Sequence, residues 1–463
     1  MSLAEHLDRP LGRGRTPAGS HTGAAGGAAC GDLVRVSLAL DGSTVAAAGF
    51  DAAGCAAAVA AGSAVVGLVG GRPLLDAARV GTAEIAAELG GLSPAGLHAA
   101  ELAADALHRA LGAAARAGAE LEPDAGRTLV AMSGGVDSAV AALLVGPGAV
   151  AVTLELWSDP ANDGDRSCCS PQAVRGARAL AHGMGLPHLS VDLRAEFRAG
   201  VVEPWLADHA AGLTPNPCVR CNGEVRLDEM LALAARLGAG ALATGHYARV
   251  EDGLLRVAAD PAKDQSYMLA GLDPASIARL RFPLGELRKE AVRELAAGAG
   301  LAVAGKPDSQ DLCFLAGTGR AAFLARHGGQ EAHPGPIVDR AGRRLGRHRG
   351  QHDYTVGQRR GLGVGGGEPL YVLEKAGDTV VVGPRSELAG RRVTLRDAVV
   401  HRPGADAVRL RYRQRPLACR VVAGPGEGRL ELELLDPVGG GIAPGQLGCL
   451  MAGEIVVGHG TIV

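Results

Sequence analysis

Residues 129–144, LVAMSGGVDSAVAALL, set the architecture expected for the middle of the chain. An apolar run is followed by SGGVDS and then by an apolar segment with helical spacing. A strand that turns through glycines into a helix presents backbone N–H groups and the positive end of the helix dipole to a ligand. The stretch therefore predicts a loop that binds a phosphate group. It is not a Walker loop, because it has no Gly-Lys-[Ser/Thr].

The segments around this loop predict a parallel sheet. The runs TLVAM, VAVTLELW, HLSVDL and GALATGH are typical of buried strands, and helical stretches separate them up to about residue 315. This alternation indicates an α/β doubly wound domain with helices on both faces of the sheet.

The two flanking regions predict different folds. Before a polar boundary at 121–127, strand patterns over 33–50 and helical patterns over 55–69, 73–89 and 94–118 predict an α+β domain. After about residue 334, short runs such as PIVD, DYTV and RLELELL alternate with Gly and Pro turns. They predict a β-rich module followed by a C-terminal β-barrel, so the whole chain is expected to be multidomain.

The composition limits the kind of protein that this chain can be. With 463 residues it should hold two to four domains, and its net charge of −2 means that a nucleic acid must be met by a local basic patch. The opening residues do not show the charged and then apolar pattern expected of a secretory leader, and no apolar run approaches the roughly 20 residues that span a bilayer. We expect a cytoplasmic protein with reduced thiols and no membrane contact. Cys419 and Cys449 lie in strand-like segments and are expected in the core.

The stretch TPNPCVRCN, residues 214–222, places Cys218 and Cys221 three positions apart. Its prolines and asparagines suit neither a helix nor a strand. Four interpretations are open at this point: half of a zinc site, a redox disulfide, ligands of an iron–sulfur cluster, or a catalytic thiol with a neighbour.

Several motifs together resemble a known family. SGGVDS resembles the pyrophosphate loop of the PP-loop superfamily, whose members cleave ATP to AMP and pyrophosphate. LELW, CCS, TPNPCVRCN, ATGHYARV, KDQSYML, KPDSQDLCF and YTVGQRRGLG occur in the order seen in bacterial tRNA-specific 2-thiouridylases, the MnmA family. The resemblance covers about three-quarters of the chain. It implies a tRNA-uridine 2-sulfurtransferase that uses ATP and Mg²⁺ to adenylate C2 of the wobble uridine and then thiolates it. The implied partners are tRNA and a sulfur donor, either a cysteine desulfurase or a sulfur-relay protein.

The resemblance also assigns binding residues position by position. Those expected to line ATP are Ala131, Met132, Ser133, Gly134, Gly135, Val136, Asp137, Ser138, Leu154 and Gly245. Those expected to contact tRNA are Asn216, Pro217, Cys218, His246, Lys263, Asp264, Gln265, Gln358, Arg411 and Tyr412. Residues 342–363 hold six arginines against one aspartate, which is the local basic patch that RNA binding requires.

Thiolation needs a sulfur nucleophile that can give its sulfur away, such as a persulfide, and a second thiol that releases it. The resemblance assigns the persulfide to Cys313 and the nucleophile or disulfide partner to Cys221. Cys218 departs from the commoner family pattern, which has an aspartate with an acid–base role there. Cys218, Cys221 and Cys313 also offer three thiolates for an iron–sulfur cluster, and both mechanisms stay open.

The N-terminal region resembles iron–sulfur scaffolds of the IscU type and the amino-terminal part of NifU. Cys30, Asp32, Cys55 and His98 match the ligand positions of those scaffolds, but Ala99 stands where a third cysteine is expected. The remaining four side chains allow metal or cluster binding. A degenerate scaffold that docks a sulfur donor and a domain that relays sulfur directly are the two alternatives. Glu101 and Asp105, on the same predicted helix as His98, are expected on its solvated face.

These inferences predict four domains: a scaffold-like domain over 1–120, an adenylating domain over 126–325, a small tRNA-binding module over 326–388 and a β-barrel over 389–463. Two other functions compete with the main one. The first is a PP-loop enzyme that thiolates another RNA base. The second is an iron–sulfur carrier whose C-terminal part is a nucleotide-gated delivery module.

Overall fold

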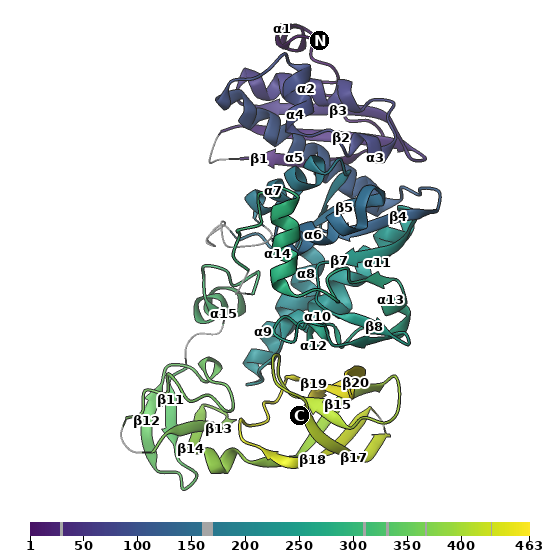
Figure 1. Cartoon of the computed structure of the whole chain (residues 1–463). Helices are drawn as coiled ribbons and strands as arrows, with labels where there is room; N and C mark the ends of the chain where they lie inside the picture. Colours follow the sequence, from purple (N-terminus) through teal and green to yellow (C-terminus); the bar gives the residue numbers. More distant parts are fainter. Residues whose placement is uncertain (28–30, 160–169, 309–311, 330–332, 366–367, 427) are drawn as a thin grey trace.

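The centre of the molecule is a five-stranded parallel sheet, shown in Figure 1 for a computed structural model. The structure describes residues 1–27, 31–159, 170–308, 312–329, 333–365, 368–426 and 428–463. In sheet order the strands are β10 (Leu280–Arg281), β7 (Ala239–Thr244), β4 (Asp124–Ala131), β5 (Ala149–Glu155) and β6 (His188–Asp192). Every residue of β5 is buried, as its apolar sequence predicts. The chain order reverses between β4 and β7, and ligands bind at such a switch point in doubly wound sheets.

Helices cover both faces of this sheet, which confirms the predicted doubly wound fold. On one face α6 (Val136–Val145) packs beside α7 (Pro171–Gly183) and α14 (Lys289–Gly298). On the other face α11 (Leu227–Arg236) packs beside α5 (Pro94–Ala117). Helix α5 belongs by sequence to the N-terminal domain, so one helix serves two cores.

The N-terminal domain is the predicted α+β unit. Its antiparallel sheet runs in the order β1 (His21–Gly26), β2 (Leu33–Asp41), β3 (Thr44–Ala53). The helices are α1 (Leu3–Asp8), α2 (Ala56–Val69), α3 (Leu74–Ala77), α4 (Thr82–Glu88) and α5. The prediction of a single helix over 73–89 is wrong. The helix is interrupted before Gly81, and α4 begins after it, with the Gly81 N–H donating a hydrogen bond to the Glu84 carboxylate.

Polar contacts lock α5 against the parallel-sheet domain. The Asp105 carboxylate lies 2.7 Å from both Arg175 and Arg178 of α7, and its side chain is only 6% exposed. One turn further, Arg109 donates two hydrogen bonds, of 2.7 and 2.9 Å, to Glu155 at the end of β5. The expectation that Asp105 lies on a solvated face is therefore wrong, because this face of α5 meets a second domain.

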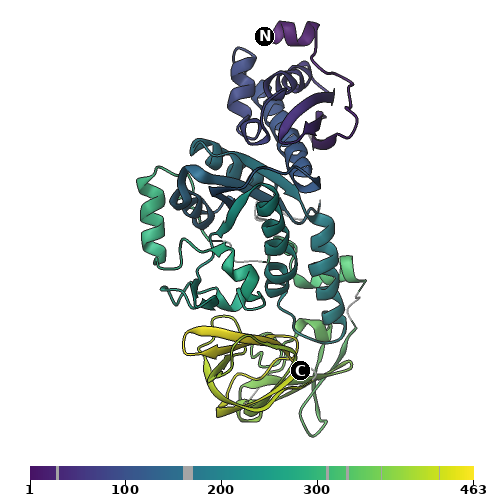
Figure 2. The same ribbon diagram turned by 90° about the vertical axis from the view of Figure 1, so that its right-hand side faces the viewer.

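A close backbone approach completes this interface. At Gly112 of α5, a Cβ atom would overlap the backbone carbonyl oxygen of Ser190 in β6. Only glycine allows the helix to lie this near the edge strand. The N-terminal domain thus sits directly on the sheet in both views, at the upper end of the molecule (Figures 1 and 2).

Two β structures lie at the opposite end. One sheet has the order β12 (Arg344–His348), β11 (Gly335–Val338), β14 (Thr379–Pro384), β13 (Leu370–Ala376). The other contains β15 (Gly390–Val400), β18 (Arg429–Val438), β17 (Leu417–Gly426), β16 (Ala407–Arg409), β19 (Leu447–Ala452) and β20 (Ile455–Ile462). Pairing of β15 with β20 closes it into a barrel, which β9 (Leu254–Arg256) and β8 (Arg249–Glu251) extend. DYTV forms no strand, so that prediction is wrong.

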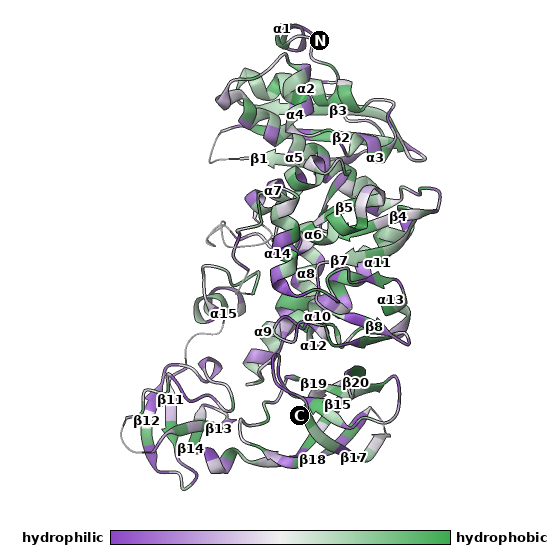
Figure 3. Cartoon of the chain, viewed as in Figure 1, coloured by the Kyte–Doolittle hydropathy of each residue, from purple (hydrophilic) through white to green (hydrophobic). Residues whose placement is uncertain are grey.

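Burial follows the apolar pattern of the sequence. Figure 3 shows hydrophobic residues along the strands of the parallel sheet and in the barrel. Cys419 and Cys449 are buried there, as predicted, and burial raises their pKa values to about 11 and about 12. Among the described residues, no helix combines the length and the apolar character that crossing a membrane requires.

Alanine at two helical glycines should change stability in opposite directions. Gly112→Ala would push a methyl group into the Ser190 carbonyl, and we expect it to lower the free energy of unfolding by about 1–3 kcal/mol. Gly176 of α7 would meet nothing within 4 Å of a Cβ, so Gly176→Ala should raise that free energy by about 0.5–1 kcal/mol. Thermal unfolding of the full chain measures both. A stabilising Gly112→Ala would contradict the close docking of α5.

Candidate functional site

A cavity of about 590 Å³ opens at the carboxyl ends of β4, β5 and β7, where the strand order reverses. Its lining brings together segments that are far apart in the sequence. Of the residues predicted to bind ATP, it includes Ala131, Met132, Ser133, Gly135, Val136, Asp137, Ser138, Leu154 and Gly245. Of those predicted to handle sulfur or tRNA, it includes Pro217, Cys218, Cys221, His246, Lys263, Gln265, Cys313 and Tyr412.

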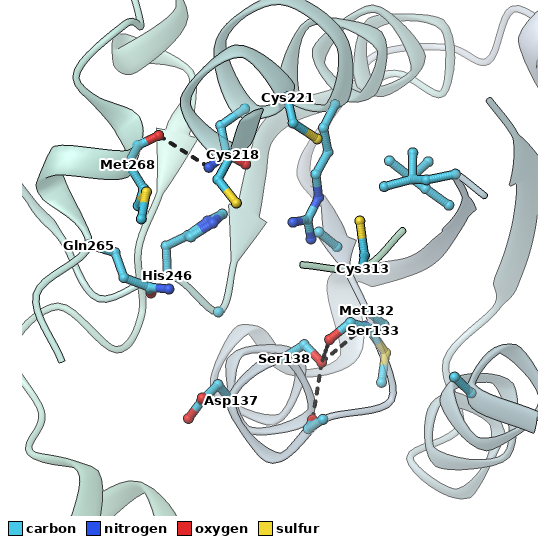
Figure 4. Close-up of a pocket in the computed structure, with 18 of the residues that line it drawn as sticks. Met132, Ser133, Asp137, Ser138, Cys218, Cys221, His246, Gln265, Met268 and Cys313 are labelled. Atoms are coloured by element: carbon cyan, nitrogen blue, oxygen red, sulfur yellow. Dashed lines mark hydrogen bonds between the residues drawn. The ribbon is translucent and has the colours of Figure 1, made fainter. Parts of the chain in front are cut away.

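The phosphate loop between β4 and α6 has the predicted strand–glycine–helix form. Gly134 has φ of +69°, and a Cβ there would lie 2.8 Å from the Ala173 carbonyl oxygen of α7, so both conformation and space favour glycine. The Ser138 hydroxyl accepts a hydrogen bond from the Ser133 N–H at 3.1 Å and donates one to the Gly135 carbonyl at 3.1 Å (Figure 4). These bonds hold the start of α6 open toward the cavity, where its N–H groups suit an anion.

Lysines surround this loop: Lys263 and Lys306 belong to the KDQSYML and KPDSQDLCF motifs, whereas Lys289 lies in no motif. The buried Lys289 ammonium, at the start of α14, lies 2.7 and 2.8 Å from the two Asp137 oxygens and 2.8 Å from Asp308. Lys263 pairs with Asp308 at 2.7 Å, and Lys306 donates to the Gly134 carbonyl at 2.9 Å. Burial acts to raise the pKa of Asp308, but hydrogen bonds from Lys263 and Lys289 outweigh it and lower that pKa to about 2.

The C-x-x-C segment is helical, which corrects the expectation that it suits neither helix nor strand. Asn216 caps α10 (Pro217–Arg220), with its side-chain oxygen accepting from the Cys218 N–H at 3.1 Å. Proline fits the first position of a helix, where no N–H is needed. A π-helix, η4 (Cys221–Arg226), follows and leads into α11. Figure 4 shows Cys218 of α10 and Cys221 of η4 on one side of the cavity. Cys313 lies across the cavity from them, above the phosphate loop with Ser133 and Ser138.

An aromatic cluster fixes the chain next to Cys313. Phe314 is 1% exposed and packs against Trp157, Phe197, Trp205 and Phe323, with ring centroids 5.1–6.4 Å apart. Both tryptophans and three of the five phenylalanines of the chain gather here. Cys313 is therefore half-buried at the edge of a rigid cluster and also lines the cavity.

The residues predicted to contact tRNA occupy different environments. Lys263, Gln265, His246 and Tyr412 line the cavity, and burial lowers the pKa of His246 to about 3, with the Arg226 charge as a second cause. His246 is thus neutral at physiological pH and fits no role as a cation.

Three others make internal contacts. Asp264 is buried and pairs with Arg409 of the barrel at 2.6 Å. Arg411 donates to the carbonyls of Val356 and Gly440, and Gln358 bonds within its own loop. Their predicted tRNA contacts stay predictions. Sequence reasoning missed Gln446, which donates to the Thr214 carbonyl at 2.5 Å and so joins the barrel to the C-x-x-C segment.

The ligand-type residues of the N-terminal domain are partly assembled. Asp32 accepts from the Cys55 N–H at 2.7 Å and from its thiol at 3.2 Å, and Cys55 is exposed. His98 is 40% exposed and lies 3.8 Å from Glu101, while Ala99 is buried. Cys30 lies outside the described residues, as do Cys168 and Cys169 of the CCS motif.

Among the residues that the structure describes, no three histidine, cysteine or carboxylate side chains come together as a metal site. Cys218, Cys221 and Cys313 therefore share a cavity without forming a ready cluster site.

Comparisons with known proteins cover the whole chain. Four family models match: a NifU-like N terminal domain over 2–117, a tRNA methyl transferase HUP domain over 126–317, a tRNA methyl transferase PRC-barrel domain over 321–384 and an aminomethyltransferase beta-barrel domain over 389–462. The bifunctional protein NifU/MnmA of Rubrobacter xylanophilus is 45% identical, over 99% of this chain and 97% of its own. The tRNA-specific 2-thiouridylases MnmA of Methylorubrum extorquens and Thermobifida fusca are each 44% identical over 73% of this chain, which spans 94% and 95% of theirs.

Removing the Lys289 ammonium should lower the stability of the protein and release Asp137 of the phosphate loop from its ion pair. In Lys289→Met, Asp137 and Asp308 lose their shared counter-ion, and we expect the free energy of unfolding to fall by about 1–3 kcal/mol. Lys263→Met is the matched control, because Lys263 is 30% exposed and, among the described residues, its one ion pair is with Asp308, so its loss should cost less. Thermal unfolding ranks the two variants. The reverse ranking would contradict the bridging role of Lys289.

Proposed function

Since the chain belongs to the MnmA family and carries the NifU-like domain of the bifunctional NifU/MnmA proteins, we propose that it is a tRNA-uridine 2-sulfurtransferase. The observation that carries the proposal is a single cavity lined by a phosphate loop and by Cys221 and Cys313. An adenylating site and a sulfur-transfer site have to share one cavity when both act on the same carbon. The target that we assign is C2 of the wobble uridine.

The phosphate loop and its lysines support adenylation. The N–H groups at the start of α6 would hold the pyrophosphate part of ATP, with Lys263 and Lys306 beside it. The C2 carbonyl oxygen of the uridine attacks the α-phosphorus, pyrophosphate leaves, and AMP stays on that oxygen. One carboxylate plus phosphate oxygens suffice for Mg²⁺, so Asp137 is the residue that would hold it. The ion would neutralise phosphate charge.

The thiols on the facing wall support sulfur transfer. A sulfur donor, a cysteine desulfurase or a relay protein, charges Cys313 as a persulfide. Its terminal sulfur attacks C2, and AMP leaves with the electron pair of the C2–O bond. The Cys221 thiolate then attacks the Cys313 sulfur, which leaves the outer sulfur on the uridine and joins the two cysteines in a disulfide. A dithiol reductant must open that disulfide before the next turnover.

An iron–sulfur cluster on Cys218, Cys221 and Cys313 is the other candidate for the sulfur carrier. The described arrangement of these thiols does not fit a cluster, so we derive no step through one. The Asp32–Cys55 pair supports a separate proposal, in which the N-terminal domain binds a metal or cluster with help from Cys30 and His98.

The β module and the barrel are the proposed tRNA-binding surface. The arginines of residues 342–363 lie on and around β12, and Tyr412 and Arg413 of the barrel reach the cavity rim. This arrangement would let tRNA phosphates bind outside while the anticodon base enters the cavity. Because tRNA is the substrate, we place the protein in the cytoplasm.

Substituting the sulfur-handling cysteines should separate the two half-reactions. Cys313→Ser and Cys221→Ser should lower the formation of 2-thiouridine by at least about 100-fold while pyrophosphate is still released, whereas Asp137→Ala should lower both. Mass analysis of nucleosides from the treated tRNA measures the product, and a phosphate assay measures pyrophosphate. A different thiolated base would favour the competing RNA thiolase, and full thiolation by Asp137→Ala would refute the adenylation step.

The iron and acid-labile sulfide content of the full chain, purified without oxygen, distinguishes a persulfide on Cys313 from an iron–sulfur cluster as the sulfur carrier. With the persulfide mechanism, Cys218→Ser and Cys313→Ser leave the iron content of the protein unchanged, since any iron belongs to the N-terminal domain. Equal loss of iron and sulfide in both variants, with Cys55→Ser as the control for the N-terminal site, would instead establish a cluster on the thiols of the cavity.

A further inference from the structure

Arg226 is a cation in the cavity wall for which the proposed steps give no role. It closes the π-helix η4 and lines the cavity together with Cys218, Cys221 and Cys313. Its charge also reaches the neighbouring His246, whose pKa it helps to lower. Because His246 is neutral, Arg226 carries the positive charge on this wall.

The other cations of the cavity already have partners. Lys263 is paired with Asp308, Lys306 is bonded to the Gly134 carbonyl, and Arg413 on the exposed rim stacks over the Tyr412 ring. The Arg226 side chain, by contrast, is half-buried, and its guanidinium makes no hydrogen bond, ion pair or ring contact in the part of the chain that the structure describes. A half-buried guanidinium without a counter-ion costs desolvation energy that an anionic ligand would recover.

The local backbone explains why Arg226 faces the thiols. Hydrogen bonds of a π-helix run from residue i to i+5, so residues five apart come to the same side. In η4 these residues are Cys221 and Arg226, and both line the cavity. In a regular α-helix, five residues turn well past one full turn, and the two side chains would diverge.

The proposed chemistry brings one anion to this place. Sulfur must come within about 3–3.5 Å of C2 to attack it. The phosphorus of the adenylated uridine is only two bonds from C2, through the C2–O–P linkage. A cation set among the attacking thiols therefore faces the phosphate of the leaving AMP, whereas the lysines on the loop face the pyrophosphate.

We propose that Arg226 is a further catalytic residue: its guanidinium binds the phosphate of the uridine-bound AMP and stabilises the charge that grows as AMP leaves. The inference rests on the proposed function and deepens it. Planar, bidentate hydrogen bonding to a phosphate is a property of arginine that neither lysine nor glutamine reproduces.

The test uses the full chain, a tRNA substrate, and ATP or its α-thio analogue, in which sulfur replaces one α-phosphate oxygen. We expect Arg226→Gln to slow single-turnover thiolation by about 10²–10³-fold and Arg226→Lys by about 10-fold. The wild type should discriminate between the two α-thio stereoisomers, and Arg226→Gln should lose that discrimination. Arg220→Gln is the control, because Arg220 ends α10 directly before η4, is 42% exposed and pairs with Glu224.

Three results would count against the inference. Undiminished stereoisomer discrimination in Arg226→Gln would show that the guanidinium does not touch the α-phosphate. A shifted pH profile for alkylation of Cys221, with discrimination retained, would assign Arg226 to thiolate activation instead. Wild-type rates in Arg226→Lys together with unfolding of Arg226→Gln would reduce its role to stability. A wild type that forms no 2-thiouridine would refute the proposed function itself, which separates the two failures.

Discussion

One ammonium group holds the adenylating half of the cavity together. Lys289 is 7% exposed and lies within 2.8 Å of carboxylates on two segments, Asp137 at the start of α6 and Asp308 before the Cys313 loop. An unpaired buried lysine would be costly, and so would two carboxylates at this distance without a cation. The phosphate loop and Asp308, which lies five residues before Cys313, are thereby fixed relative to each other.

The Cys313 loop is held from its other side by packing. In a chain with only 3% aromatic residues, the cluster around Phe314 holds both tryptophans and three of the five phenylalanines. Aromatic pairs contribute more than their buried area alone. Cys313 thus lies between the ion pairs of Asp308 on one side and the aromatic packing of Phe314 on the other.

Local patterns predicted much of this architecture. SGGVDS after an apolar strand was sufficient to predict the phosphate loop, because a strand, a glycine turn and a helix are all encoded within 16 residues. The parallel sheet was predicted from the alternation of apolar runs with helical stretches. Lys289 and Arg226 were missed, since neither lies in a motif and each owes its role to segments far away in the sequence. Asp105 was misplaced for the same reason: helical spacing shows which residues share a face, but not that a second domain covers that face. The π-helix at Cys221 has no sequence signal at all.

The docking of α5 has a consequence for how the chain is made. The N-terminal domain leaves the ribosome first, and domains generally fold as they emerge. Yet one side of α5 finds its partners only when β6 and α7 have been synthesised, more than fifty residues later. Until then, Gly112, Asp105 and the neighbouring apolar positions remain uncovered on the nascent chain. Because the N-terminal domain precedes the parallel-sheet domain in the chain, its helix α5 is already folded when the parallel sheet forms, and the sheet forms against that helix.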